Sequence, residues 1–337
     1  MFTYVEAAGC TNACRHCASE GSPPYGGFFT VVELRGLVAD GWRLYPYYEA
    51  SAHPEFPEIL APDICGDGGD YLSTNGYGIA RAKDPPGLFA RLRELGWRWL
   101  SLTLHGLEEH HDWFVCRKGA YADIIRATEL ARASGFGLHW NLMPDNRNLE
   151  EMPGLLAVSR DMVGSNGWLC LPGHHANRRL WRYESLRPSV TDIRERLAPW
   201  IVEDVWKTSD GGKVEPEQMT EAYWLAKWRE SVATGEGLDR FDFGVEPRPV
   251  LKITRQRQVF ITDPPPMALL GDLSEGRAIL EERAWQHAAR PLCETPPPEA
   301  AALEGSGLLH PNGAGVRMKV ISSMLYGPAA ATTALTM

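Results

Sequence analysis

A chain of 337 residues, 44% of them apolar, is long enough to bury one large core or two modest ones. Its formal net charge of −9 argues against a nonspecific nucleic-acid binder, because neutralising phosphates requires a basic face. No apolar run approaches the ~20 residues that a membrane helix needs, and the first residues do not resemble a secretory signal. We therefore expect a soluble cytoplasmic protein with no membrane partner.

Strand-like and helix-like segments alternate along the first 180 residues. Apolar, β-rich segments predict six strands, at residues 2–8, 43–50, 71–75, 97–105, 136–143 and 168–171. Helices are predicted after a capping box at Thr30 and Glu33, at 54–60, at 85–96 with Asp84 as the cap, at 121–134, and from Asn148 onward. This alternation predicts a parallel sheet with right-handed crossovers, either an open doubly wound sheet or a partial barrel.

Beyond residue 190 the pattern changes. Residues 250–261 are β-rich, and the last part of the chain is rich in Pro, Gly and Ala. Four tryptophans mark a segment of helical period that is typical of helices packed over a core: Trp200, Trp206, Trp224 and Trp228. We divide the chain into a core at 1–190, a helical and β covering extension at 191–290, and a tail at 291–337.

Three of the seven cysteines, Cys10, Cys14 and Cys17, cluster directly after the first predicted strand. An odd total with four scattered cysteines does not suggest a disulfide framework. Three thiolates at this spacing can hold an Fe–S cubane and leave one iron open for a substrate or cofactor. A structural zinc knot with His16 as the fourth ligand is the alternative, although no second Cys or His pair follows to complete an ordinary zinc module.

The C-x-x-x-C-x-x-C spacing after a first strand resembles the radical S-adenosylmethionine (SAM) superfamily. The resemblance implies a partial (β/α)6 TIM-like barrel with a C-terminal α/β extension. It also implies a [4Fe–4S] cluster ligated by Cys10, Cys14 and Cys17, whose open iron chelates the amine and carboxylate of SAM. An electron from the cluster then cleaves the sulfonium to a 5′-deoxyadenosyl radical, so an electron donor such as flavodoxin or ferredoxin is an expected partner.

Two further stretches resemble family motifs that bind SAM. Residues 47–54 resemble a diverged G-G-E-P stretch that supports the methionine amine, which makes Glu49 a candidate; a solvated loop charge is the alternative. Residues 72–76 resemble the T-N-G ending of a third strand, with Ser73 and Asn75 as candidates. An Asn-Gly pair is also ordinary turn chemistry, because both residues tolerate positive φ.

The fourth and fifth strands supply three more candidates. Residues 102–106 resemble an S-l-x-G pattern in which Thr103 keeps a hydroxyl for a ribose or carboxylate. Residues 117–121 resemble R-x-G-x-y, and the planar guanidinium of Arg117 suits the methionine carboxylate, with a helix-surface salt bridge as the alternative. Asn141, near the end of the fifth strand, is a ribose candidate.

The histidines do not predict a second metal. His110 and His111 are adjacent, so in a helix they point about 100° apart. His174 and His175 could bind substrate or transfer a proton, but ordinary loop histidines are the favoured interpretation. Residues 269–276 resemble the lead into extensions that carry auxiliary clusters, yet only Cys293 follows, so we expect no such cluster.

The resulting hypothesis is an enzyme that abstracts hydrogen from a small polar intermediate of an antibiotic, nucleoside or amino-acid-derived natural product. The net negative charge of the chain suits a cationic substrate. Without auxiliary clusters to accept an electron, a redox-neutral epimerisation or rearrangement is favoured. An epimerase needs a hydrogen donor on the opposite face, and Cys170 is the first candidate ahead of Cys65 and Cys293, although isolated cysteines are often small buried hydrophobes.

Two other functions stay open. Modification of a ribosomally made peptide would predict a leader-binding winged-helix module, for which the early start of the barrel leaves no room. A zinc-stabilised, non-enzymatic binding protein would predict bound zinc and no SAM cleavage.

Overall fold

The computed structural model describes residues 1–15, 27–46, 49–66, 70–169, 249–263 and 268–289, with a few single residues between 186 and 234. Several predictions lie outside the described residues: those for His16, Cys17, Cys170, His174, His175, Cys293, the four tryptophans and the tail.

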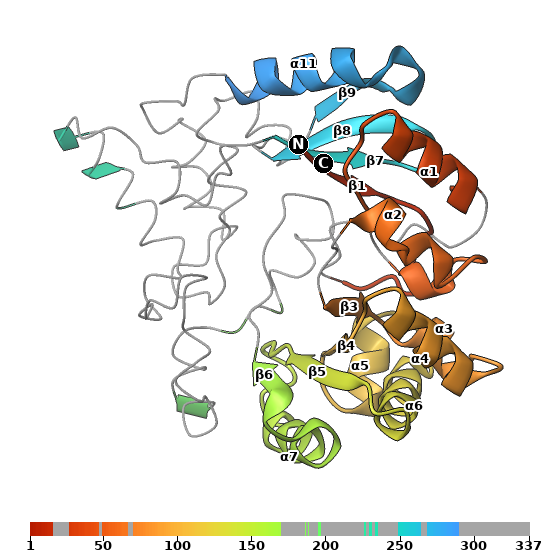
Figure 1. Ribbon diagram of the computed structural model, residues 1–337. Coiled ribbons are helices and arrows are strands. Elements are labelled where there is room, and N and C mark those ends of the chain that lie inside the picture. Colours follow the sequence, from red (N-terminus) through yellow and green to blue (C-terminus); the bar gives the residue numbers. More distant parts are fainter. Residues whose placement is uncertain are drawn as a thin grey trace.

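Two sheets carry the described strands (Figure 1). The first has the order β2-β1-β7-β8-β9: β1 (Phe2–Val5), β2 (Leu44–Pro46), β7 (Val250–Ile253), β8 (Gln258–Asp263) and β9 (Ala268–Asp272). The second has the order β3-β4-β5-β6: β3 (Tyr71–Thr74), β4 (Trp99–Leu104), β5 (Gly137–Leu142) and β6 (Gly167–Leu169). Strand β1 is parallel to β2, and β3 to β6 are parallel to one another, so the predicted partial TIM-like barrel is confirmed.

Helices connect successive strands from β1 to β6, and Figure 1 shows α1, α4 and α6 on the same side of the two sheets. The α-helices are α1 (Val31–Ala39), α2 (Pro62–Cys65), α3 (Tyr77–Ala80), α4 (Pro85–Glu94), α5 (Glu108–Phe114), α6 (Ala120–Ala133), α7 (Met152–Val163) and α11 (Arg277–Ala288). Four 3-10 turns complete the described elements: η1 (Ala50–Ala52), η2 (Glu58–Leu60), η3 (Gly164–Asn166) and η8 (Leu273–Glu275). Among the described helices, none is long and apolar enough to cross a membrane.

Local capping signals predicted two helix starts correctly. The Thr30 and Glu33 capping box opens α1, and the Asp84 carboxylate accepts from the Gly87 backbone N–H at the start of α4. The helix predicted at 54–60 is wrong in its first half, where the chain makes turns before η2.

The helix predicted from Asn148 begins only at Met152. Asn148 instead holds a loop together, since its amide donates to the backbone carbonyls of His105 and Met143 at 2.8 and 2.9 Å. Its Oδ1 accepts from the Asp145 N–H at 2.7 Å. An asparagine that satisfies backbone groups on two neighbouring strand ends delays the helix that its sequence pattern suggests.

Strand β7 joins the N-terminal strand directly. It lies parallel to β1, with Leu251 opposite Thr3 and Ile253 opposite Val5. Leu251 and Ile253 are fully buried. A segment that we assigned to the extension therefore completes a sheet begun at the N-terminus, while the division at residue 190 stays a prediction.

The second sheet has two chemically different faces. Leu100, Leu102 and Trp140 are fully buried, and the Trp140 indole donates to Thr128 of α6 at 3.1 Å, which identifies the helix-facing side. Because side chains alternate along a strand, the intervening residues lie on the other face. Toward the carboxyl ends of the strands these residues are polar: Ser73, Ser101, Thr103, His139 and Asn141. Tyr71 and Trp99 lie on the same face nearer the start of the strands.

Candidate functional site

The cysteine loop begins after β1 and rests against the end of α5. Backbone N–H groups of Ala13 and Arg15 donate to the carbonyls of Val115 and Phe114, both at 3.0 Å. Cys10 and Cys14 are both partly exposed. Two of the three predicted metal ligands are thus placed on one loop at the carboxyl end of a parallel strand, where sites in αβ folds form.

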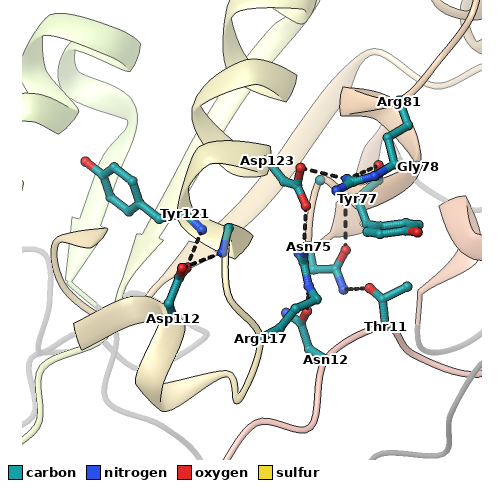
Figure 2. Close-up of polar contacts among 12 residues, drawn as sticks. Thr11, Asn12, Asn75, Tyr77, Gly78, Arg81, Asp112, Arg117, Tyr121 and Asp123 are labelled. Atoms are coloured by element: carbon teal, nitrogen blue, oxygen red, sulfur yellow. Dashed lines mark hydrogen bonds and ion pairs between the residues drawn. The ribbon is translucent and has the colours of Figure 1, made fainter. Parts of the chain in front are cut away.

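Asn75, at the end of β3, contacts this loop. Its Nδ2 donates to the Thr11 hydroxyl at 2.9 Å (Figure 2). The same nitrogen lies 3.5 Å from the Cys10 sulfur. Its Oδ1 accepts from the Tyr77 backbone N–H at 3.0 Å. The following Gly76 has φ of +79° and lies against α6, so the predicted Asn-Gly turn exists and also positions a polar side chain.

Glu49 is buried beneath Asn75. One carboxylate oxygen accepts from the Ser51 and Thr74 hydroxyls at 2.5 and 2.6 Å, and the other from the Asn75 backbone N–H at 2.5 Å. Burial raises the pKa of this carboxyl, and the hydrogen bonds that it accepts act in the opposite direction. The alternative of a solvated loop charge is wrong, because Glu49 is 2% exposed.

Arg117 connects the cysteine loop to α6. Its Nε donates to the Asn12 side-chain oxygen at 2.6 Å, and Nη1 pairs with Asp123. Arg81 approaches the same carboxylate at 2.6 Å, and its guanidinium carbon lies 4.0 Å from the centroid of the Tyr77 ring (Figure 2).

The ion pair of Arg117 is not on the surface, since the side chains of Arg117 and Asp123 are 15% and 11% exposed. Within the part of the chain that the structure describes, the buried Nη2 has no hydrogen-bond partner. A buried guanidinium nitrogen needs an acceptor, so this donor fits a carboxylate such as that of a bound amino acid. The carboxylate role predicted for Arg117 is therefore compatible with its geometry.

The polar face of the second sheet holds the remaining candidates. Thr103 pairs in register with Asn141, and Ser73 with Ser101. Asn141 donates to the Ser101 hydroxyl at 3.0 Å, and that hydroxyl lies 3.3 Å from Nδ1 of His139. Burial lowers the pKa of His139.

Sequence reasoning missed Ser101 and His139. Both stand two residues before a chosen candidate, Thr103 and Asn141, so the period of two along a strand was the signal that could have found them.

The histidines after β4 contact different partners. His110 lies 2.7 Å from the Asp145 carboxylate, whereas Nδ1 of His111 accepts from the His105 backbone N–H at 3.1 Å. No group of three or more His, Cys, Asp or Glu side chains converges as a metal site within the described ranges. The two side chains thus point in different directions, as expected for adjacent positions of a helix.

The family model of the radical SAM superfamily matches residues 7–156. Residues 7–156 form a radical SAM domain. This domain contains the cysteine loop, the Glu49 and Asn75 contacts, Arg117 and the polar face. Its family implies a [4Fe–4S] cluster and SAM as cofactors. A non-enzymatic zinc protein does not agree with this match.

Solved structures of similar fold include anSMEcpe with bound AdoMet, at 12% identity and a TM-score of 0.49 over 100% of this chain and 95% of that chain. Another is Streptococcus suis SuiB bound to S-adenosylmethionine, at 7% identity and a TM-score of 0.48 over 98% of this chain and 76% of that chain. A search of curated proteins found no match to the chain.

The residues of the radical SAM domain fit these cofactors. Two cysteine thiols on one loop are suitable ligands for a cluster, and backbone or amide N–H groups already face the sulfur of Cys10. The unsatisfied Arg117 donor and the neighbouring polar face suit the carboxylate and ribose of SAM.

Proposed function

We propose that this protein cleaves SAM reductively at a [4Fe–4S] cluster held by Cys10, Cys14 and Cys17, and removes a hydrogen atom from a small polar natural-product intermediate. The observation that carries the proposal is the placement of Cys10 and Cys14 at the end of β1, tied to the ends of β3 and α5 within a radical SAM domain. When bound, the cluster and SAM together supply the electron and the radical precursor.

The chain's own residues orient SAM. Arg117 Nη2 is proposed to bind the methionine carboxylate, because it is a buried donor close to the cysteine loop. Thr103 and Asn141, neighbours in register, are proposed to hydrogen-bond the ribose, and the adjacent Ser73, Ser101 and His139 to face the substrate. Glu49 acts through Asn75, since its carboxylate is occupied by donors from the protein itself.

A redox-neutral outcome, epimerisation or rearrangement, is the specific reaction that we propose. No gathering of cysteines that could hold a second cluster occurs among the residues with described positions. Cys65 packs against the hydrophobic core, where its thiol donates to the Ile59 carbonyl. Cys170 therefore stays the first candidate for the hydrogen donor.

The first experiment tests SAM cleavage. The purified chain is reconstituted anaerobically with iron and sulfide, and 5′-deoxyadenosine is measured after adding dithionite and SAM. We expect formation by the native chain and a loss of at least about tenfold in Cys14→Ala, because a cluster with two ligands is not held. The exposed Cys116→Ala variant is the matched control and should behave like the native chain. Absence of product, with one equivalent of bound zinc, would leave a structural metal site instead.

A second experiment addresses the reaction class. With a turnover substrate in D₂O, an epimerase that uses a thiol donor places solvent deuterium at the inverted carbon. Cys170→Ala should abolish that deuterium while 5′-deoxyadenosine still forms. Unchanged epimerised product in Cys170→Ala would remove Cys170 from the proposal.

A further inference from the structure

Two N–H groups of the chain lie within hydrogen-bond distance of the Cys10 sulfur. The Asn12 backbone N–H lies 3.4 Å from Sγ, and Asn75 Nδ2 lies 3.5 Å from it. The first contact belongs to the cysteine loop itself, whereas the second comes from the end of another strand. Figure 2 shows the Asn75 amide directed toward the loop, beside Thr11.

The Asn75 side chain is fixed in this orientation from three sides. Tyr77 donates its backbone N–H to Oδ1, which assigns the NH₂ end of the amide to the loop. Thr11 accepts from Nδ2, and Glu49 accepts from the Asn75 backbone N–H. Glu49 is in turn held by Ser51 and Thr74. The donor is thus preorganised by protein contacts, and its position does not depend on a cofactor.

We infer that Asn75 raises the reduction potential of the cluster through its hydrogen bond to the Cys10 sulfur. The inference rests on the proposed ligation of the cluster by Cys10. A hydrogen bond to a ligating sulfur stabilises negative charge, and the reduced cluster carries one more electron than the oxidised one. The hydrogen bond from Asn75 therefore stabilises the reduced cluster more than the oxidised cluster. Asn75 acts on the cluster through Cys10 and is a positioning residue.

The test compares the full chain with Asn75→Leu and Asn75→Asp after anaerobic reconstitution with iron and sulfide. An EPR-monitored redox titration gives the midpoint potential of each cluster. For Asn75→Leu we expect the ratio of reduced to oxidised cluster at a fixed potential to fall roughly fivefold, a downward shift of about 40 mV for one electron. Asn75→Asp should shift further in the same direction, because it removes the donor and adds a negative charge.

The matched control is Thr11→Val, which removes the other acceptor of the same amide and leaves its contact with sulfur. Its potential should equal that of the native chain. Equal shifts in Thr11→Val and Asn75→Leu would overturn the inference, because they would show that disturbance of the loop sets the potential. Native potentials in both Asn75 variants would overturn it too, as would loss of the cluster from both.

Those outcomes would leave the proposed function standing as long as the native chain forms a [4Fe–4S] cluster. A native chain that shows no such EPR signal would overturn both proposals together.

Discussion

At the scale of single residues, buried polar groups organise the site. Glu49 is 2% exposed and accepts four hydrogen bonds, and Arg117 connects Asn12 to Asp123 with little solvent exposure. A buried polar group is costly without partners, so each of these side chains restricts the positions of the groups that satisfy it. These contacts fix the position of the cysteine loop.

His111 gives the protein a pH dependence that can be measured. Burial lowers its pKa to about 4, with Arg117 and His110 acting in the same direction and Asp112 opposing them. An unfolded histidine titrates near 6.5, so between pH 6.5 and 4 the unfolded state binds more protons. The free energy of unfolding should therefore fall as the pH falls across this window, by up to about 3 kcal/mol from His111 alone. Urea denaturation at several pH values measures it.

The control is His111→Asn, whose side-chain oxygen can accept the His105 N–H that Nδ1 now accepts. Asparagine does not titrate, so the variant should lose less stability than the native chain between pH 6.5 and 4. Parallel pH profiles for the two proteins would contradict the assignment to His111.

At the scale of elements, short turns pack on one another without space for a side chain. Gly78 in α3 lies against η1, where an added Cβ would stand 1.9 Å from the Ser51 carbonyl oxygen. The Gly78 N–H also donates to the Ser51 hydroxyl at 3.0 Å. This contact holds η1 against α3. Glu49 directly precedes η1 and Asn75 lies just before α3, so the contact also keeps these two residues close together.

Gly78→Ala should therefore destabilise the protein by about 2–4 kcal/mol, because the backbone of η1 or α3 must move. Thermal unfolding of the chain measures the loss. Gly36→Ala in α1 is the matched control, since an added Cβ there meets nothing within 4 Å. Alanine in a helix interior is favoured over glycine, so Gly36→Ala should stabilise by about 0.5–1 kcal/mol. Similar melting temperatures for the two variants would contradict this account.

At the scale of the whole molecule, strands from opposite parts of the sequence make one sheet. β7 pairs with β1, and β8 and β9 extend the sheet beyond it. Arg255, just after β7, donates its backbone N–H to the buried carboxylate of Glu6 at 3.4 Å. The strand that carries the cysteine loop is therefore held on one side by a segment 248 residues later in the chain.

Leu251→Ala in β7 tests this arrangement. Leu251 is fully buried, so its truncation should lower the free energy of unfolding by about 2–5 kcal/mol. Leu269→Ala in β9 is the control, because Leu269 is 54% exposed and should cost less than about 1 kcal/mol. Chemical denaturation of both variants compares them. A small loss for Leu251→Ala would show that β7 is not needed to stabilise the sheet.

The sequence by itself determined the local features and carried the resemblance of residues 7–156 to the radical SAM superfamily. The Thr30 and Asp84 caps, the positions of most strands and the cysteine spacing depend on residues a few positions apart, and local hydrogen bonding specifies them. The parallel α/β class followed from the alternation of strands and helices, whereas the partial barrel followed from the resemblance to the radical SAM superfamily.

Only the tertiary structure decided which distant side chains meet. The sequence could not show that Asn75 faces Cys10, that Arg117 holds Asn12, or that β7 lies beside β1. It also could not show that Asn148 donates to backbone carbonyls at the ends of β4 and β5, so that α7 begins only at Met152. These contacts depend on strand register and on how helices pack against the sheets, which are set by the burial of the whole core and not by any short stretch of residues.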